Sequence, residues 1–286
     1  MVKIRITGKI KIKFYLCYDY QPAQFNFHFK MNDTKLTGQT FWENYWEGKP
    51  GNRKKKTSLL IKEILRFFDR HLPATPGLTI LEVGGAYGHY LLYLTRHFGY
   101  SAFSLDYSNV GNKQTQETFE KAGIPVEVFE RDLFADNSDL PKFDIVYSLG
   151  FIEHFDEPVN VVARHLDLLK PGGILLLGVP NYSGIYRKVL QRLAPSIEQT
   201  HNMKTMDLEN WKLFTEKLPL EPLFVGYIGG FEPLNMKKLE VKTISNKLIH
   251  NFVRILMVLF SFRMQFLRRF NSKYTSGYLV GMYRKK

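Results

Sequence analysis

Short apolar segments alternate with amphipathic segments through the middle of the chain, between residues 57 and 182. The apolar segments have the length of strands and lie at 79–83, 102–106, 126–133, 143–149 and 168–181. The stretch between the first two, from Tyr90 to Phe98, has room for one helix. Strands that alternate with helices predict a parallel sheet covered by helices on both faces.

The first apolar segment runs into a glycine-rich turn at residues 84–88, and a helix is expected to begin near Tyr87. Small residues let the backbone approach a ligand closely, and the start of a helix offers free N–H groups to it. The turn therefore predicts a ligand at the carboxyl end of the first strand. A buried turn without a ligand is the alternative.

Glu82, just before this turn, narrows the choice of ligand. A carboxylate would repel a dinucleotide pyrophosphate, and the dinucleotide motif would need glycines where the chain has Ala86 and His89. A cofactor with a cationic amino group would instead be attracted to Glu82.

The run from Glu82 to Gly88 resembles the first motif of the class I S-adenosylmethionine-dependent methyltransferases, which reads acidic-x-G-x-G-x-G. Ala86 takes the place of the middle glycine. Later segments resemble further motifs of this family: the short strand that ends at Asp106, the fourth strand with its Glu-His turn at 143–154, and the fifth strand, entered through a Pro-Gly-Gly turn at 171–173. The resemblance covers residues 41–286 and implies S-adenosylmethionine as the cofactor.

The resemblance also implies roles for individual residues. Asp106 matches the carboxylate that binds both ribose hydroxyls, although it could instead be the N-cap of a helix that follows Ser108. Asp132 matches the residue that meets the adenine amino group. The implied cofactor contacts in this part of the chain are Glu82, Gly84, Gly85, Ala86, Gly88, Asp106, Tyr107, Asp132, Leu133, Ser148 and Leu149.

Four aromatic residues fall within Phe41–Glu47, which resembles the aromatic helix that closes over the cofactor in this family. Tyr45 and Trp46 would exclude water and face the cationic sulfonium, which aromatic faces attract. A hydrophobic staple of this helix onto the core is the alternative. The basic run at 53–56 favours a solvated linker, with phosphate binding as the alternative.

The fold that the resemblance implies is α/β, with a Rossmann-like seven-stranded sheet that is mostly parallel and carries helices on both faces. Segments 221–228 and 277–284 resemble its sixth and seventh strands, of which the last runs antiparallel. A helical insertion, residues 232–272, would lie between them. We expect an accessory N-terminal extension at 1–40 and a methyltransferase domain at 41–286.

Charge is distributed unevenly along these 286 residues, which carry a formal net charge of +13. Residues 1–56 hold 12 Lys/Arg against 4 Asp/Glu, and residues 237–286 hold 12 against 1. The middle of the chain is therefore acidic, and the basic character belongs to the flanks. Basic flanks suit nucleic acid, an anionic membrane surface or an acidic substrate.

The segment from Ser245 to Phe270 is expected to form a basic helix rich in Leu, Ile, Met and Phe. Its longest uncharged apolar run, Ile255–Phe260, is far shorter than the roughly 18–20 residues that a transmembrane helix needs. Three roles remain open for it: a lid or partner-subunit contact, a helix lying on a membrane surface, or ordinary core packing.

The N-terminal residues 2–14 alternate charged and apolar positions, which favours a strand pair and excludes the unbroken apolar core of a signal peptide. Residues 1–30 can be an accessory hairpin or an upstream extension. Cys17 is the sole cysteine, so no intrachain disulfide is possible. We therefore expect a cytoplasmic protein, with peripheral membrane contact through 245–270 as an open alternative.

Methyl transfer needs alignment of acceptor, methyl and sulfur, and a base only where the acceptor must lose a proton. His154 and His201 are the candidate bases, with packing or lining of the acceptor pocket as their alternatives. No pair of carboxylates with an Asn follows the fourth strand, so we expect no metal. An Asn/Asp-Pro-Pro-Tyr signature for amine methylation is missing there too.

These observations favour a metal-independent methyltransferase that acts on an oxygen of a small-molecule or lipid-linked acceptor. An RNA or protein methyltransferase that uses the basic flanks is the alternative enzyme, and nucleic acid is the less favoured partner. A non-catalytic S-adenosylmethionine-binding scaffold is the alternative outside enzymes. The oligomeric state stays open.

Overall fold

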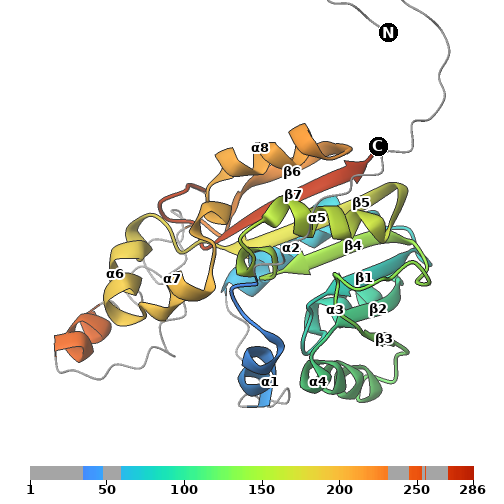
Figure 1. Ribbon diagram of the computed structural model, residues 1–286, viewed down its shortest axis with the longest axis horizontal. Helices are drawn as coiled ribbons and strands as arrows, with labels where there is room; N and C mark the ends of the chain where they lie inside the picture. Colours follow the sequence, from blue (N-terminus) through green and yellow to red (C-terminus); the bar gives the residue numbers. More distant parts are fainter. Residues whose placement is uncertain (1–34, 48–58, 231–244, 253–254, 256–269) are drawn as a thin grey trace, which may run out of the picture. The chain divides into compact units, whose positions relative to one another are not determined.

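A seven-stranded sheet is the framework of the chain in the computed structural model, which describes residues 35–47, 59–230, 245–252, 255 and 270–286. The strand order is β3-β2-β1-β4-β5-β7-β6 (Figure 1). The strands are β1 Thr79–Val83, β2 Ser101–Asp106, β3 Glu127–Glu130, β4 Phe143–Leu149, β5 Leu169–Pro180, β6 Leu220–Ile228 and β7 Tyr278–Lys285.

The pairing confirms the predicted topology. Strands β1 to β5 run parallel to one another, while β7 runs antiparallel to both β5 and β6. In the register, Leu81 of β1 faces Phe103 of β2 and Val146 of β4. The third strand is shorter than the predicted 126–133, because the chain turns away after Glu130 and the Asp132 side chain accepts a hydrogen bond from the Phe134 N–H at 3.0 Å.

The helices lie on both faces of this sheet, as the alternating pattern predicted. They are α1 Gln39–Glu47, α2 Leu59–His71, α3 His89–Phe98, α4 Asn109–Glu120, α5 Pro158–Asp167, α6 Ile185–Leu193, α7 Ser196–Thr200 and α8 Leu208–Lys217, with the 3-10 turns η1 Ile152–His154 and η2 Met203–Met206.

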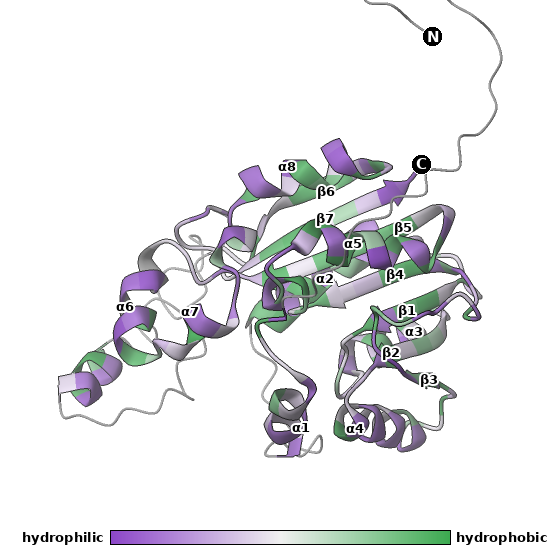
Figure 2. Cartoon of the chain, viewed as in Figure 1, coloured by the Kyte–Doolittle hydropathy of each residue, from purple (hydrophilic) through white to green (hydrophobic). Residues whose placement is uncertain are grey.

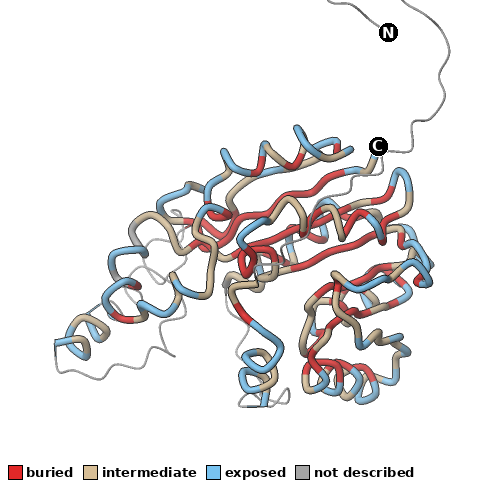
Figure 3. Tube along the Cα trace, in the orientation of Figure 1, coloured by how far each residue is buried: buried red, intermediate tan, exposed pale blue. Residues whose placement is uncertain are grey.

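Alternate residues of each strand feed two separate cores. Ile80 of β1 packs with side chains from α2 and α3, such as Phe68 and Leu94. Leu81, one residue further on, packs with side chains from α5 and α8, such as Val162. The hydrophobic residues of the central strands are buried accordingly (Figures 2 and 3). Burial of both faces fixes the register, because a slip by one residue would exchange the two cores.

The predicted insertion between β6 and β7 lies only partly within the described residues, which are helical at 245–252. The side chains of Leu248, Phe252 and Ile255 are exposed there. Among the described residues, no helix combines the length and apolar character needed to cross a bilayer. The predicted N-terminal hairpin at 2–14, Cys17 and the basic run at 53–56 lie outside the described residues.

Candidate functional site

The glycine-rich turn follows β1 and has a backbone that few residues adopt. Gly84 has a φ of 68°, and Gly88 has a φ of 59° as the N-cap of α3. Tyr87 has a φ of 76°, which is uncommon for a residue with a side chain. The helix therefore begins at His89, two residues later than predicted, because the left-handed residues 87 and 88 belong to the turn. Strained backbone of this kind is concentrated at functional sites.

The glycines also make room for neighbouring side chains. A Cβ on Gly85 would lie 2.1 Å from Cδ of Glu82, and one on Gly84 would lie 2.3 Å from Cδ2 of Phe151. Ala86, which replaces the middle glycine of the motif, lies against Gly111 of α4, where an added Cβ would be 3.1 Å from the Ala86 Cβ. A glycine on the facing helix thus accommodates the extra methyl group.

Glu82 is the buried carboxyl at this turn. It is 4% exposed, and its Oε2 atom has no hydrogen-bond partner among the described residues. Burial raises its pKa to about 8, the neighbouring Tyr147 hydroxyl opposes that rise, and the charge of Asp106 adds to it. A buried carboxyl with a free oxygen fits the cationic amino group of S-adenosylmethionine, whose charge would compensate the carboxylate.

Asp106 ends β2 and is almost as deeply buried. Its Oδ1 atom accepts a hydrogen bond from the Ser108 N–H at 2.8 Å, and burial raises its pKa to about 7. The N-cap of α4 is Ser108, whose hydroxyl accepts from the Gly111 N–H at 3.1 Å. The alternative role of Asp106 as the N-cap is therefore wrong, and ribose binding stays a prediction. Tyr107, the next residue, accepts a hydrogen bond from the Gln39 amide at its carbonyl, at 2.8 Å.

Asp132 lies in a different setting from the one that the sequence suggested. Its Oδ2 atom forms an ion pair with Lys35. The ammonium group of Lys35 also lies 5.4 Å from the centre of the Tyr107 ring and 5.4 Å from that of Phe134. Lys35 thus places a cation at the end of the site where the adenine is predicted to bind. The sequence pattern did not predict this role for Lys35.

Three other predicted cofactor contacts are Leu133, which follows Asp132, and Ser148 and Leu149, which end β4. Leu133 is buried with its side chain in the hydrophobic core, so only its backbone can meet a ligand. The Ser148 hydroxyl lies 3.1 Å from Nε2 of the buried His165 and is engaged there. Leu149 ends the strand and is half-buried against the core.

Helix α1 lies across this region and connects its parts. Trp46 packs edge-to-face on Tyr87 of the glycine turn, with ring centres 5.0 Å apart. Trp42 packs edge-to-face on His154, with ring centres 4.8 Å apart. Tyr45 is 40% exposed and stacks on Phe41. The aromatic helix therefore touches both the cofactor turn and the predicted base, and Trp42 is a contact that the sequence did not single out.

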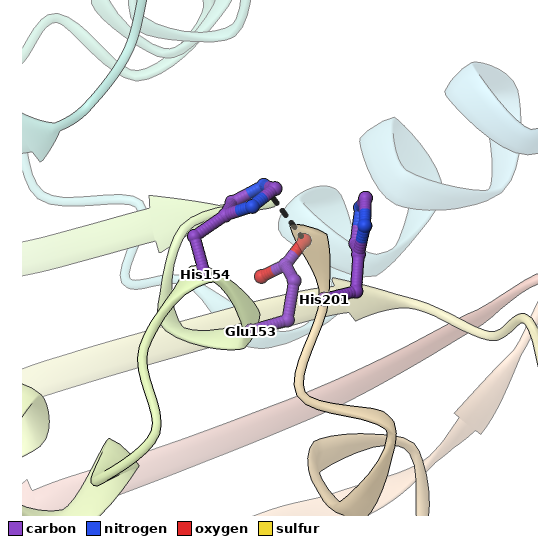
Figure 4. A group of neighbouring side chains, drawn as sticks. All are labelled: Glu153, His154 and His201. Atoms are coloured by element: carbon purple, nitrogen blue, oxygen red, sulfur yellow. Dashed lines mark ion pairs between the residues drawn. The ribbon is translucent and has the colours of Figure 1, made fainter. Parts of the chain in front are cut away.

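The two predicted bases lie side by side. The rings of His154 and His201 have centres 4.5 Å apart, although the two residues are 47 positions apart in the chain. Hydrogen bonds between η1 and the segment before η2 hold them there: the Asn202 N–H donates to the Glu153 carbonyl at 2.6 Å, and His154 Nδ1 lies 2.7 Å from the Thr200 carbonyl. In Figure 4 the Glu153 carboxyl lies beside the two imidazole rings, with one oxygen turned toward His154.

Glu153 is the third member of this group and was not predicted as a site residue. It is 1% exposed, its Oε1 atom lies 4.0 Å from Nε2 of His154, and burial raises its pKa to about 8. Burial and then the neighbouring charge of His201 lower the pKa of His154 to about 3, and burial lowers that of His201. Burial thus favours the uncharged form of all three side chains. In the sequence, the one signal for Glu153 as a site residue is its position next to His154 in the Glu-His turn.

Residues 52–221, more than half of the chain, match the model of a methyltransferase domain. The chain belongs to this methyltransferase family. The match covers the glycine turn, Asp106, Asp132, His154 and His201, and the predicted class I fold and its cofactor, S-adenosylmethionine, are those of the family.

Curated relatives are more distant. This methyltransferase is 24% identical over 161 residues to 27-O-demethylrifamycin SV methyltransferase of Amycolatopsis mediterranei. The aligned residues cover 53% of this chain and 56% of that protein. It is 30% identical over 118 residues to cyclopropane-fatty-acyl-phospholipid synthase of Escherichia coli. Here the aligned residues cover 40% of this chain and 29% of that protein. The chain thus spans about half, or less, of the length of these relatives.

The fold is shared with many solved structures. One of them is the crystal structure of YjhP from Escherichia coli, with a TM-score of 0.52 and 17% sequence identity. That match covers 84% of this chain and 99% of the other. It supports the architecture of this methyltransferase and not a particular acceptor.

Proposed function

We propose that this methyltransferase transfers a methyl group from S-adenosylmethionine to an oxygen atom of a small-molecule or lipid-linked acceptor, without the help of a metal ion. The observation that carries the proposal is the pairing of two sites by α1. Trp46 packs on the glycine turn, and Trp42, on the same helix, packs on His154 beside His201. A cofactor pocket and a pair of bases are thereby joined by one aromatic helix.

The cofactor end is formed by residues whose chemistry suits the parts of S-adenosylmethionine. Glu82 offers a carboxyl oxygen that has no described partner to the amino group, and the buried Asp106 offers its carboxyl to the ribose. Trp46 and Tyr87 offer aromatic surface to the sulfonium. The bound cofactor supplies an already activated methyl group, so the protein has only to align the acceptor and exclude water.

The acceptor end is formed by the two histidines. Nδ1 of His154 lies 2.7 Å from the Thr200 carbonyl, and Nδ1 of His201 lies 2.9 Å from the Ile197 carbonyl and 2.9 Å from the Thr200 hydroxyl. Because a carbonyl oxygen can only accept a hydrogen bond, we place the proton on Nδ1 in both rings. Each Nε2 atom therefore carries a lone pair that can accept a proton from a hydroxyl group. We assign the base to His201, because it is half-buried, whereas His154 is buried and covered by Trp42.

The relatives support an acceptor of this class. One is named for methylation of a rifamycin and the other for modification of a fatty-acyl phospholipid. The exposed Leu248, Phe252 and Ile255 on the insertion favour contact with an apolar partner or a membrane surface over core packing. We extend the proposal accordingly to a cytoplasmic protein that can meet a lipid surface peripherally.

Partition of a labelled methyl group tests this function. The protein is incubated with methyl-labelled S-adenosylmethionine and separate extract fractions of small metabolites, lipids, RNA and protein. Label in the metabolite or lipid fraction that is identified as a methyl ether or methyl ester supports the proposal. Label in RNA or protein would replace it with the alternative enzyme, and no label in any fraction would favour a non-catalytic scaffold.

A further inference from the structure

The group formed by Glu153, His154 and His201 has a second chemical capacity besides base catalysis. The donor atoms of these three side chains lie within 4.8 Å of one another (Figure 4). Two imidazoles and one carboxyl group, which would release its proton on binding the ion, form a donor set that suits zinc, cobalt or ferrous iron. Small side-chain movements would bring three such atoms to the roughly 2.0–2.2 Å at which Zn²⁺ is bound.

The surroundings of the two rings are those of metal ligands. Metal-binding histidines nearly always donate their other ring N–H to a carbonyl or carboxylate, which fixes the tautomer and the orientation of the ring. The Nδ1 atoms of His154 and His201 lie 2.7 Å and 2.9 Å from backbone carbonyls of Thr200 and Ile197. Both Nε2 atoms are consequently left as donors of an electron pair.

The carboxyl group gives an independent indication of a ligand. Glu153 is 1% exposed, and its Oε2 atom has no hydrogen-bond partner among the described residues. A buried polar atom without a partner is costly, and a cation would satisfy it. The rings of Trp42 and Tyr182, with centres 4.8 Å from His154 and 5.2 Å from His201, add walls that limit the access of water.

We propose that Glu153, His154 and His201 bind one divalent transition-metal ion of the zinc class, and that the bound ion inhibits the enzyme. The inhibition rests on the proposed function, because the ion would occupy the same Nε2 lone pair of His201 that accepts the proton of the acceptor. Metal binding and base catalysis therefore exclude one another at this site.

Cobalt binding tests the site without reference to activity. The full chain is treated with a chelator, dialysed and titrated with Co²⁺, and visible absorption and calorimetry are recorded. We expect one ion per chain, with an affinity at least tenfold weaker in each of Glu153→Gln, His154→Gln and His201→Gln. His97→Gln is the matched control, since it removes a histidine outside this group of three. The His97 side chain is half exposed, and its Nε2 atom lies 3.4 Å from Oδ1 of Asp69. No binding, or binding that these three variants leave unchanged, would overturn the proposal.

Thermal unfolding guards against variants that do not fold. Co²⁺ should raise the unfolding temperature of the wild-type protein and of His97→Gln, and not that of a folded His201→Gln. Turnover then separates the site from the proposed function. Inhibition by Zn²⁺ that a chelator reverses supports the second half of the proposal. If turnover required the ion, both the proposed inhibition and the proposed metal-independent reaction would be wrong. The cobalt titration would still show whether the three residues bind a metal ion.

Discussion

The Glu43 carboxylate of α1 caps the first turn of α4 at Ser108. Its Oε2 atom accepts hydrogen bonds from the Ser108 hydroxyl at 3.0 Å and from the Val110 N–H at 3.1 Å, and its Oε1 atom accepts from the Asn109 N–H at 2.9 Å. A negative charge is favoured at the start of a helix, where N–H groups lack partners. This contact anchors the aromatic helix beside Asp106 and Tyr107.

Removal of the Glu43 charge is expected to loosen α1. The Glu43→Gln variant should lose about 1 kcal/mol of unfolding free energy and bind S-adenosylhomocysteine more weakly, because the charged cap is replaced by a neutral one. Glu47→Gln removes the same charge from an exposed position on the same helix and is the control. Chemical denaturation and calorimetry measure both quantities. Equal effects of the two substitutions would show that the cap does not anchor the helix.

Asp106 is expected to contribute to affinity for the cofactor. Asp106→Ala removes charge-assisted hydrogen bonds to the ribose and should cost about 1.5–3 kcal/mol of binding free energy. Asp136→Ala, at an exposed position, should leave the affinity unchanged. Calorimetric titration with S-adenosylhomocysteine decides between these outcomes. An unchanged affinity of Asp106→Ala would remove its assigned role, and tighter binding of NAD would refute the cofactor.

Gly85 is expected to tolerate no side chain. In Gly85→Ala the new Cβ would meet the Glu82 carboxyl at 2.1 Å, so the carboxyl must move from its place at the turn. We expect a loss of about 1–3 kcal/mol in unfolding free energy, together with weaker cofactor binding. Gly38→Ala places the same methyl group where nothing lies within 4 Å. If both variants bound the cofactor like the wild type, the turn would not shape its pocket.

The affinity for the cofactor should rise with pH. Glu82 has a pKa raised to about 8 by burial, so it is protonated at neutral pH and must release its proton to pair with a cationic amino group. Affinity for S-adenosylhomocysteine should therefore increase by up to about tenfold per pH unit between about pH 6 and pH 8. Calorimetry in buffers of different ionisation enthalpy measures the released proton. A slope that persisted in Glu82→Gln would assign the proton to another group.

The raised pKa of Glu82 also makes the stability of the ligand-free protein depend on pH, and this stability should fall as pH rises. A carboxyl with a pKa raised in the folded state binds more protons there than in the unfolded chain, so the free energy of unfolding falls as pH rises between the two pKa values. For Glu82 that window runs from 4.5 to about 8. The ligand-free wild type should lose stability across this range more steeply than Glu82→Gln.

The sequence predicted the sheet well because strands buried on both faces carry an unmistakable apolar pattern, interrupted by turns such as the one at 84–88. It predicted the start of α3 less well. Tyr87 reads as a helical residue by its type, yet its φ of 76° places it in the turn, and nothing in its side chain indicates this. The end of β3 was also misjudged, since Asp132 turns the chain through a local hydrogen bond.

Long-range contacts account for what was missed at the site. Lys35 and Asp132 are 97 residues apart, and Glu43 and Ser108 are 65 apart, so neither pair leaves a local pattern in the sequence. The sequence pattern predicts a role for His154 and none for its neighbour Glu153. Its importance comes from burial beside two histidines, and burial of a polar residue is not visible in an isolated turn.

A steady-state assay of methyl transfer, run on the fraction that takes up label, addresses the proposed reaction itself. Wild-type protein should transfer the methyl group to a metabolite or lipid hydroxyl. His201→Gln should lower kcat by about 10² or more with little change in the KM for S-adenosylmethionine, because the base is lost while the cofactor pocket is intact. Wild-type turnover in His201→Gln, or the absence of methyl transfer from the wild-type protein to any hydroxyl acceptor, would contradict this mechanism.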